Sequence, residues 1–275
     1  MSAVAEAIEA GRMPGRVWLY SNYHCNLACS YCLTESAPGV ATRRLGGDRM
    51  VALAREASEL GFNEIGVTGG EPFLEPDMPE TIARLAEIVP VVVLTNGTLF
   101  TGRRLERMAP LASEDVRIQI SLDSSDAVAN DTMRGPENFQ KVVDAIPRLI
   151  GMGIKVRIAS TLEYVAETDL SALCSLHRAL GVPDEDHIVR PIVRRGRAVD
   201  NDMGISAGAA DLPPELTITA DGAFWSAFGP TVHGGRLDTD LLVTRTTSPL
   251  RIPATTMLHL LEHQPASATA DSEFI

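Results

Sequence analysis

Apolar segments of two kinds alternate along the first two hundred residues and restrict the fold more than any other feature. Segments with the composition of strands lie at 16–21, 64–68, 91–95, 116–122, 154–159 and 187–193. Segments with apolar residues at helical spacing lie between them, at 48–60, 78–89, 103–111, 139–150 and 170–180. Parallel neighbours need a crossover, so we predict an α/β fold with one parallel sheet. Six units are fewer than the eight of a closed barrel, so the sheet should be curved and laterally open.

Three of the four cysteines lie within eight positions directly after the first predicted strand, at Cys25, Cys29 and Cys32. Thiolates select iron–sulfur clusters, zinc or copper(I) over hard cations. Zinc would need a fourth ligand, and His24 is poorly placed because it adjoins Cys25. A [4Fe–4S] cluster on three cysteines leaves one iron open to a substrate or cofactor. A structural metal loop or surface thiols are the simpler alternative.

The CxxxCxxC spacing, with Tyr31 before the last cysteine, resembles the cluster loop of the radical S-adenosylmethionine (radical SAM) superfamily. Later segments resemble further motifs of that family in the same order: Gly69-Gly70-Glu71-Pro72, Thr95-Asn96-Gly97, Ser121-Leu122-Asp123 and Arg134-Gly135. The resemblance covers Val17 to Val199 and implies a partial (β/α)6 barrel that binds one [4Fe–4S] cluster. It also implies reductive cleavage of SAM to a 5′-deoxyadenosyl radical that abstracts hydrogen from a substrate.

The same resemblance implies a SAM site formed by Tyr31, Gly69, Gly70, Glu71, Asn96, Ser121 and Arg134. In the family, the GGEP segment binds the SAM amino group. We assign Ser121 and Arg134 to the carboxylate and ribose side, because a hydroxyl and a guanidinium fork suit a carboxylate. Two departures weaken this part: Ser124 stands where the family often has Gly, and Asn130 or Asp131 where it often has His.

Four residues are candidates for substrate contacts: Ser160, Arg190, Arg194 and Trp225. Arg190 and Arg194, with Arg195 and Arg197, could form an anion pocket at the barrel mouth. A solvated basic loop is the alternative for these arginines, and a turn-forming hydroxyl is the alternative for Ser160.

We divide the chain into an N-terminal helix at 1–15, the barrel at 16–200, and a linker, hairpin and tail at 201–275. Turns are predicted at Asp221-Gly222 and Gly234-Gly235, with a closing helix at 257–262. The extension resembles the SPASM and twitch extensions of the family, but no cysteine follows Cys174, so an auxiliary cluster is not expected. We expect the hairpin to cover the open side of the barrel, with Trp225 facing the substrate and screening the radical from solvent.

Composition limits the kinds of binding partner that the chain can have. A net charge of −12 opposes loose binding to nucleic acid or to anionic membranes. No secretion signal or long apolar run is present, so we predict a cytoplasmic protein with reduced thiols.

The favoured function is a radical SAM enzyme of cofactor or natural-product biosynthesis acting on a small anionic substrate, with an external one-electron donor of the flavodoxin or ferredoxin type. A peptide-modifying maturase of the RiPP type and a non-catalytic Fe–S binding module are the alternatives.

Overall fold

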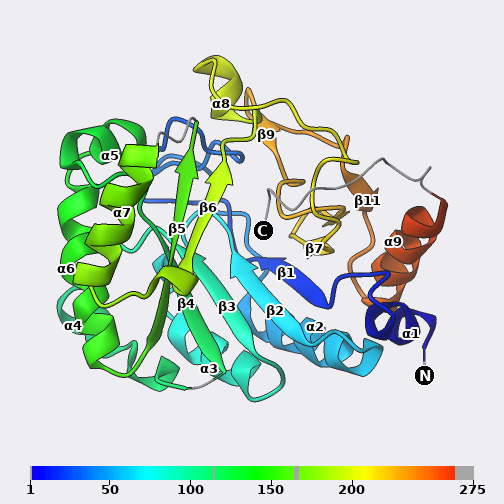
Figure 1. Ribbon diagram of the computed structural model, residues 1–275. Helices are drawn as coiled ribbons and strands as arrows, with labels where there is room; N and C mark the ends of the chain where they lie inside the picture. Colours follow the sequence, from blue (N-terminus) through cyan, green and yellow to red (C-terminus); the bar gives the residue numbers. More distant parts are fainter. Residues whose placement is uncertain (1, 114, 164–166, 264–275) are drawn as a thin grey trace.

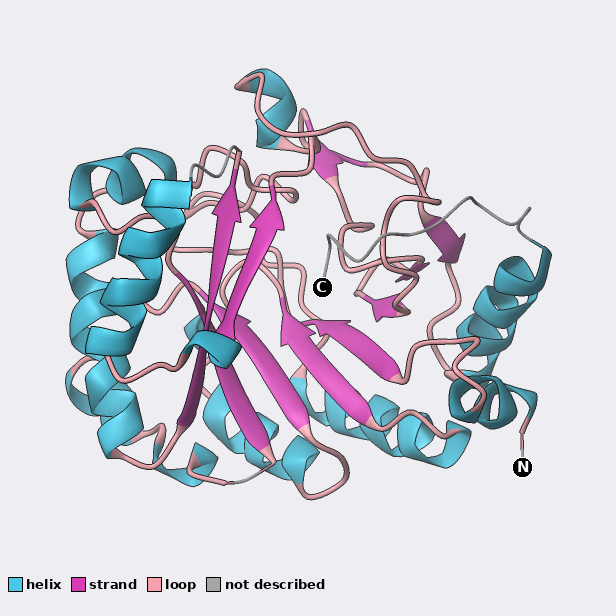
Figure 2. Cartoon of the chain, in the orientation of Figure 1, coloured by secondary structure: helices cyan, strands magenta, loops and turns pink. Residues whose placement is uncertain are grey.

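A nine-stranded sheet runs through the described part of the computed structural model, which comprises residues 2–113, 115–163 and 167–263 (Figures 1 and 2). The strand order is β11-β8-β7-β1-β2-β3-β4-β5-β6. The first six strands are all parallel to their neighbours: β1 (Arg16–Tyr20), β2 (Glu64–Thr68), β3 (Val91–Thr95), β4 (Val116–Ser121), β5 (Lys155–Leu162) and β6 (His187–Pro191). The predicted α/β fold with six parallel strands is therefore confirmed.

The helices follow the predicted crossovers, with local differences. They are α1 (Ala3–Glu9), α2 (Gly47–Leu60), α3 (Met78–Ala86), α4 (Gly102–Glu106), α5 (Ala127–Arg134), α6 (Asn138–Gly151), α7 (Glu167–Ala179), α8 (Arg197–Asp200) and α9 (Arg251–His263). Single 3-10 turns lie at η1 (Pro72–Leu74), η2 (Ala109–Leu111) and η3 (Asp184–Asp186). The segment 103–111 divides into α4 and η2. Helix α6 continues through Pro147, although a proline inside a helix usually kinks or breaks it. Helix α5 was not predicted.

The sheet has one apolar face and one mixed face because successive side chains on a strand point in opposite directions. On the apolar face, Val17, Leu19, Ile65 and Val67 belong to the main core. That core also contains residues of α2, α3 and α6, which cover the outer side of the sheet (Figure 1). The alternate residues of the same strands point to the inner side, so polar side chains there do not interrupt the core.

The C-terminal extension lengthens the sheet beyond β1. Strand β7 (Thr217–Ile218) runs parallel to β1, and β8 (Ala223–Phe224) and β11 (Leu242–Thr244) follow it in antiparallel pairs. Strands β9 (Val232–His233) and β10 (Arg236–Leu237) form a separate antiparallel pair. Both predicted turns are present, and Gly234 and Gly235 have the positive φ of +57° and +71° that a two-residue hairpin turn of this kind requires.

The position of Trp225 differs from the expectation of a hairpin lid that presents this residue to the substrate. Trp225 is 5% exposed and belongs to the main core. Its indole Nε1 donates to the Ala209 carbonyl, at 3.0 Å. The hairpin pairs with β1 at the edge of the sheet, and its backbone groups find hydrogen-bond partners there that a separate lid over the barrel would lack. The hairpin therefore continues the sheet.

The division at residues 15 and 200 stays a prediction, and the tail after residue 263 lies outside the described residues. Within those residues, no helix combines the length and apolar character that crossing a bilayer would need.

The contact between Gly66 and Trp18 on the inner face of the sheet gives a test of the packing. A Cβ at Gly66 would lie 2.2 Å from the Trp18 ring. We expect Gly66→Ala to lower the free energy of unfolding by about 1–3 kcal/mol, because the indole must shift. The matched control is Gly151→Ala at the end of α6, where a Cβ meets nothing within 4 Å. That change should be neutral or stabilising by up to about 1 kcal/mol. Urea unfolding of both variants measures the difference, and equal stabilities would contradict this packing.

Candidate functional site

The three clustered cysteines line one cavity of about 210 Å³ at the carboxyl ends of the central parallel strands. Residues at the ends of β2, β3 and β4 share the lining, including Thr68, Thr95 and Ser121. In Figure 2 the arrowheads of the parallel strands point to the side where the long loops gather. Active sites of parallel βα folds lie at this end of the sheet. The sequence motifs therefore meet at the edge where they were expected.

One side of the cysteine loop is held by the Gly69-Gly70 turn after β2. The amide of Gly70 donates to the Asn22 carbonyl at 2.8 Å, and the amide of Glu71 donates to the His24 carbonyl at 2.9 Å. A Cβ at Gly70 would lie 2.1 Å from the His24 carbonyl oxygen. The sequence suggested that these glycines allow a ligand to approach. The structure shows that they also allow the cysteine loop to approach.

The other side of the loop is held by Gly196 and Arg197, which follow β6. The Arg197 amide donates to the Cys32 carbonyl at 3.0 Å, and its guanidinium donates to the carbonyls of Cys29 and Ser36. Gly196 has a positive φ of +57°, and a Cβ there would lie 2.4 Å from the Cys32 carbonyl oxygen. The Gly196-Arg197-Ala198 segment resembles one that the family has after strand six, so the sequence left a structural role open beside the anion pocket and the solvated loop. The contacts of Arg197 agree with the structural role, because they fix the backbone that presents the thiols.

The surroundings of the thiols disfavour their ionised thiolate form. Burial raises the pKa of Cys25 to about 12, and the nearby Glu71 adds to this effect. Burial also raises the pKa of Cys29, although Arg134 acts in the opposite direction. Without metal these two thiols are therefore neutral at pH 7, and a bound cation would supply the charge that stabilises thiolates. The Cys25 sulfur accepts from the Leu27 amide at 3.3 Å and from Asn96 Nδ2 at 3.7 Å.

The donor set of the cavity fits an iron–sulfur cluster better than zinc. Among the described residues that line it, the cysteines are the only Cys, His, Asp or Glu. His24 lies outside the lining, and its Nδ1 is 3.3 Å from the Val40 carbonyl. A tetrahedral zinc site would need a fourth side chain there. A [4Fe–4S] cluster needs only three, so these residues fit that group.

Glu71 occupies a different place from its predicted contact with SAM. The residue is fully buried, and its carboxylate is absent from the cavity lining. It accepts from the Phe73 amide at 3.0 Å, from Thr95 Oγ1 at 2.8 Å and from the Asn96 amide at 2.8 Å. Burial raises its pKa to about 6, while these hydrogen bonds act to lower it. Glu71 thus fixes the turn after β3 that carries Asn96 into the cavity.

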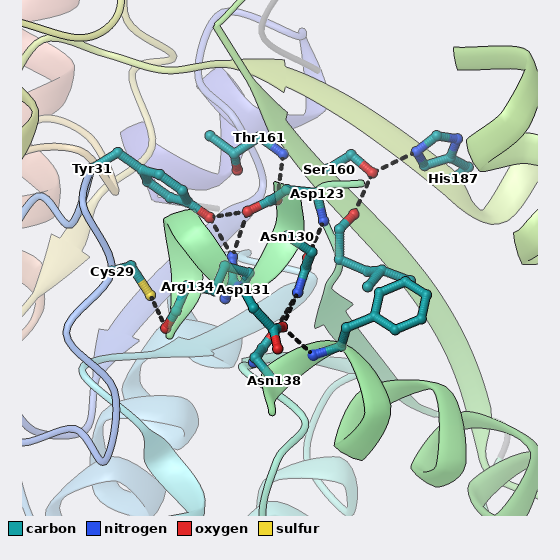
Figure 3. A network of polar contacts seen from close by, with 12 residues as sticks. Cys29, Tyr31, Asp123, Asn130, Asp131, Arg134, Asn138, Ser160, Thr161 and His187 are labelled. Carbon is teal, nitrogen blue, oxygen red and sulfur yellow. Dashed lines mark hydrogen bonds and ion pairs between the residues drawn. The ribbon is translucent and has the colours of Figure 1, made fainter. Parts of the chain in front are cut away.

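A buried ion pair organises the opposite wall (Figure 3). The Arg134 guanidinium donates to Asp123 Oδ2 at 3.0 Å and to the Tyr31 hydroxyl, which itself donates to Asp123. The other oxygen of Asp123 accepts from the Thr161 amide at 2.9 Å. The Nε of Arg134 is buried without a protein partner, and Arg134 lines the cavity. A bound anionic group could use this free donor, since buried donors normally have an acceptor.

The helix that ends at Arg134, α5, was missed by sequence reasoning. Its N-cap is Asp126, whose side chain accepts from the Ala129 amide. Asn130 of the same helix accepts from the Asp123 amide at 3.1 Å and donates to Asn138 at 2.8 Å. The Asp126 cap was the available signal. Asp123 joins the end of β4 to β5, α5 and the cysteine loop.

Nine predicted residues line the cavity together: Cys25, Cys29, Tyr31, Cys32, Gly69, Gly70, Asn96, Ser121 and Arg134. The four substrate candidates lie outside the lining. Ser160 is fully buried and donates to the Leu122 carbonyl at 2.6 Å, while Thr161 lines the cavity in its place. Arg194 is exposed and pairs with Asp202. The roles assigned to these residues stay predictions.

Comparison with known proteins places this geometry in a family. The family model described as "Radical SAM superfamily" matches residues 19–166. The chain belongs to the radical SAM superfamily. Members of this superfamily bind SAM and an iron–sulfur cluster, so family membership implies both groups as cofactors of this chain. The predicted family, whose matched relatives are enzymes, is confirmed.

The chain is similar to two curated radical SAM proteins whose names describe different activities. A probable GTP 3′,8-cyclase of Archaeoglobus fulgidus is 35% identical over 150 residues, covering 53% of this chain and 48% of the relative. The mycofactocin maturase MftC of Mycobacterium tuberculosis is 34% identical over 154 residues, covering 54% of this chain and 38% of the relative. This chain thus matches about half or less of their lengths.

Solved structures show the same fold at low identity. The structure described as native anSMEcpe with bound AdoMet and Cp18Cys peptide aligns with a TM-score of 0.61 and 11% identity. The alignment covers 90% of this chain and 81% of the other. At this identity the likeness concerns the fold alone.

The anchoring role of Arg197 can be tested through cluster retention. Arg197→Gln removes charge-assisted hydrogen bonds to the Cys29 and Ser36 carbonyls, so the loop should hold its cluster less firmly. We expect iron release to a chelator to accelerate at least about fivefold in reconstituted protein. The control is Arg178→Gln, which breaks an exposed pair with Asp184. Equal release rates in both variants would show that the guanidinium does not hold the loop.

Proposed function

We propose that this chain uses Cys25, Cys29 and Cys32 to bind one [4Fe–4S] cluster, and cleaves SAM reductively to abstract hydrogen from a small-molecule substrate. The observation that carries the proposal is the single cavity that receives three thiols and the free donor of Arg134, with no other metal-ligating side chain in its described lining. When bound, the cluster supplies the electron and the open iron for SAM cleavage.

The chain's own residues would then bind and orient SAM. Arg134 is the candidate for the carboxylate, because its Nε is free while Asp123 and Tyr31 hold its Nη1. Gly69 and Gly70 leave space beside the sulfurs, and Asn96 and Ser121 add polar groups from the ends of β3 and β4. Glu71 acts as a positioning residue through the Asn96 amide.

Apolar side chains would limit access of water to the reacting atoms. Leu27 and Leu33 of the cysteine loop and Leu94 of β3 line the cavity. A carbon radical must be kept from stray hydrogen donors, so an apolar lining suits this chemistry.

A single cluster requires an electron from outside the chain. The sequence contains four cysteines, and the fourth, Cys174, lies on α7 with its sulfur 3.8 Å from His187 Nδ1. One remaining thiol does not suffice for a second cluster of the usual cysteine-ligated kind. An external donor of the flavodoxin or ferredoxin type is therefore part of the proposal, as is a cytoplasmic location.

A peptide substrate is the second candidate. The similarity to a maturase and to a structure that contains a peptide favours it. The similarity to a probable GTP 3′,8-cyclase favours a small molecule instead. A non-catalytic Fe–S module, the third alternative, differs from both because reduced protein would not cleave SAM.

Replacement of one cysteine tests the cluster assignment. Cys29→Ala removes one of three ligands, so iron content and reductive formation of 5′-deoxyadenosine should fall at least about 100-fold, since one remaining pair of thiols no longer holds the cluster. Cys174→Ala is the matched control and should retain both. Chromatography of nucleoside products after anaerobic reduction gives the readout. Wild-type protein that holds the cluster and SAM but releases no 5′-deoxyadenosine would refute the proposed function in favour of the non-catalytic module.

A further inference from the structure

Two arginines stand on the inner wall of the barrel, next to residues that line the cluster cavity. Arg157 of β5 is in register with Gln119 of β4, and Arg190 of β6 is in register with Thr161 of β5. Residues in register on parallel neighbours, and residues two apart on one strand, share a face. Arg157 and Arg190 therefore lie on the face of Thr161, which lines the cavity. Neither arginine belongs to the core on the opposite face.

Neither guanidinium has a carboxylate bound to it. Arg157 donates through Nε and Nη2 to Gln119 Oε1, at 3.0 and 2.6 Å, and this acceptor is neutral. Arg190 has no hydrogen bond or ion pair with any residue of the described ranges, and its Nε is buried without a partner. Both side chains are half-buried, and cations withdrawn from water are normally paired.

The carboxylates near Arg157 and Arg190 already have other partners. Glu215 accepts from Arg16 at 3.0 Å and from the Trp18 indole at 2.7 Å. Glu64 pairs with Arg16 as well. Asp186 lies 3.9 Å from Arg117. The wall thus has more guanidinium than carboxylate, and the excess falls on Arg157 and Arg190.

The pKa shifts of the two arginines agree with this excess of guanidinium over carboxylate. Burial lowers the pKa of Arg157 to about 10, and Arg117, Arg190 and Arg16 lower it further by like-charge repulsion. Burial also lowers the pKa of Arg190, with Glu215 acting in the opposite direction. An anion between the two guanidiniums would relieve this repulsion, since opposite charges stabilise each other most where water is excluded.

We propose that Arg157 and Arg190 form an oxyanion site that binds the phosphate or carboxylate group of the substrate. This inference rests on the proposed function, in which the substrate lies beside SAM. It replaces the four-arginine pocket expected from sequence with a pair that includes Arg157. The other members of that pocket have partners: Arg194 pairs with Asp202, Arg195 with Asp240, and Arg197 with loop carbonyls. Gln119 orients Arg157 and leaves its charge free for the ligand.

Titration calorimetry with inorganic phosphate, and separately with acetate, tests the site in reconstituted protein saturated with SAM. Saturating SAM keeps the probe away from Arg134 and the open iron. We expect saturable binding of at least one probe, and the tighter probe identifies the group as phosphate or carboxylate. Arg157→Gln and Arg190→Gln should each weaken that binding at least about 10-fold. Arg148→Gln, an exposed arginine on α6, removes the same charge and should change nothing.

Two outcomes would overturn the inference: no saturable binding of either probe by the wild type, or equal weakening by Arg148→Gln. The wild-type measurement needs no variant, so a folding defect cannot obscure it. Arg190→Lys keeps the charge without the fork and should bind with intermediate affinity. Formation of 5′-deoxyadenosine without substrate is measured in parallel on the wild type. Its absence from the wild type would count against the proposed function, whereas its presence without anion binding would count against this site alone.

Discussion

The backbone of the cysteine loop is the constraint on which this site depends. Apart from an isolated bridge at Asn22, residues 21–46 form no helix or ladder strand, so their polar backbone groups need partners from elsewhere. The turn after β2 supplies the Gly70 and Glu71 amides, and the segment after β6 supplies the amide and guanidinium of Arg197. Both contacts require a missing Cβ, at Gly70 and at Gly196. Three thiols meet in one cavity because the segments that follow β2 and β6 both bind the backbone of the loop that carries them.

Much of the architecture could be predicted because it follows from periodicity. The bounds of β2 and β3 agree with the predicted segments residue for residue, since each is a short apolar run between a turn and a polar motif. The cavity residues from Cys25 to Arg134 could be predicted because each follows a strand, and the ends of parallel strands meet. Helix α5 could not, because the buried residues of Ala127–Arg134 are the polar Asn130 and Arg134 rather than an apolar stripe, and Asn130 holds the helix through polar contacts.

Periodicity fixes the directions of side chains poorly where polar residues adjoin. Ser160 and Thr161 are both hydroxyl residues, and a shift of one residue exchanges the two faces of a strand. Glu71 was expected in the cavity because a carboxylate suits an amino group. Its oxygens instead satisfy three donors of the chain itself, which no motif reveals. Trp225 was expected to face the substrate from a hairpin lid, but the hairpin pairs with β1 and Trp225 packs in the main core.

The arginines show the same limit of sequence reasoning for residues that lie far apart in the chain. The sequence shows four arginines close together after the last barrel strand, but three of them have partners of their own. The unbalanced pair combines Arg157 with Arg190, from neighbouring strands whose register brings distant positions onto one wall. With a net charge of −12, the protein as a whole repels an anionic substrate at long range. Screening limits that repulsion to about 8–10 Å at ordinary salt, whereas buried pairs are screened much less. An anion that reaches the inner wall would therefore be held by short, desolvated contacts, and its affinity should depend on those guanidiniums far more than on the surface charge.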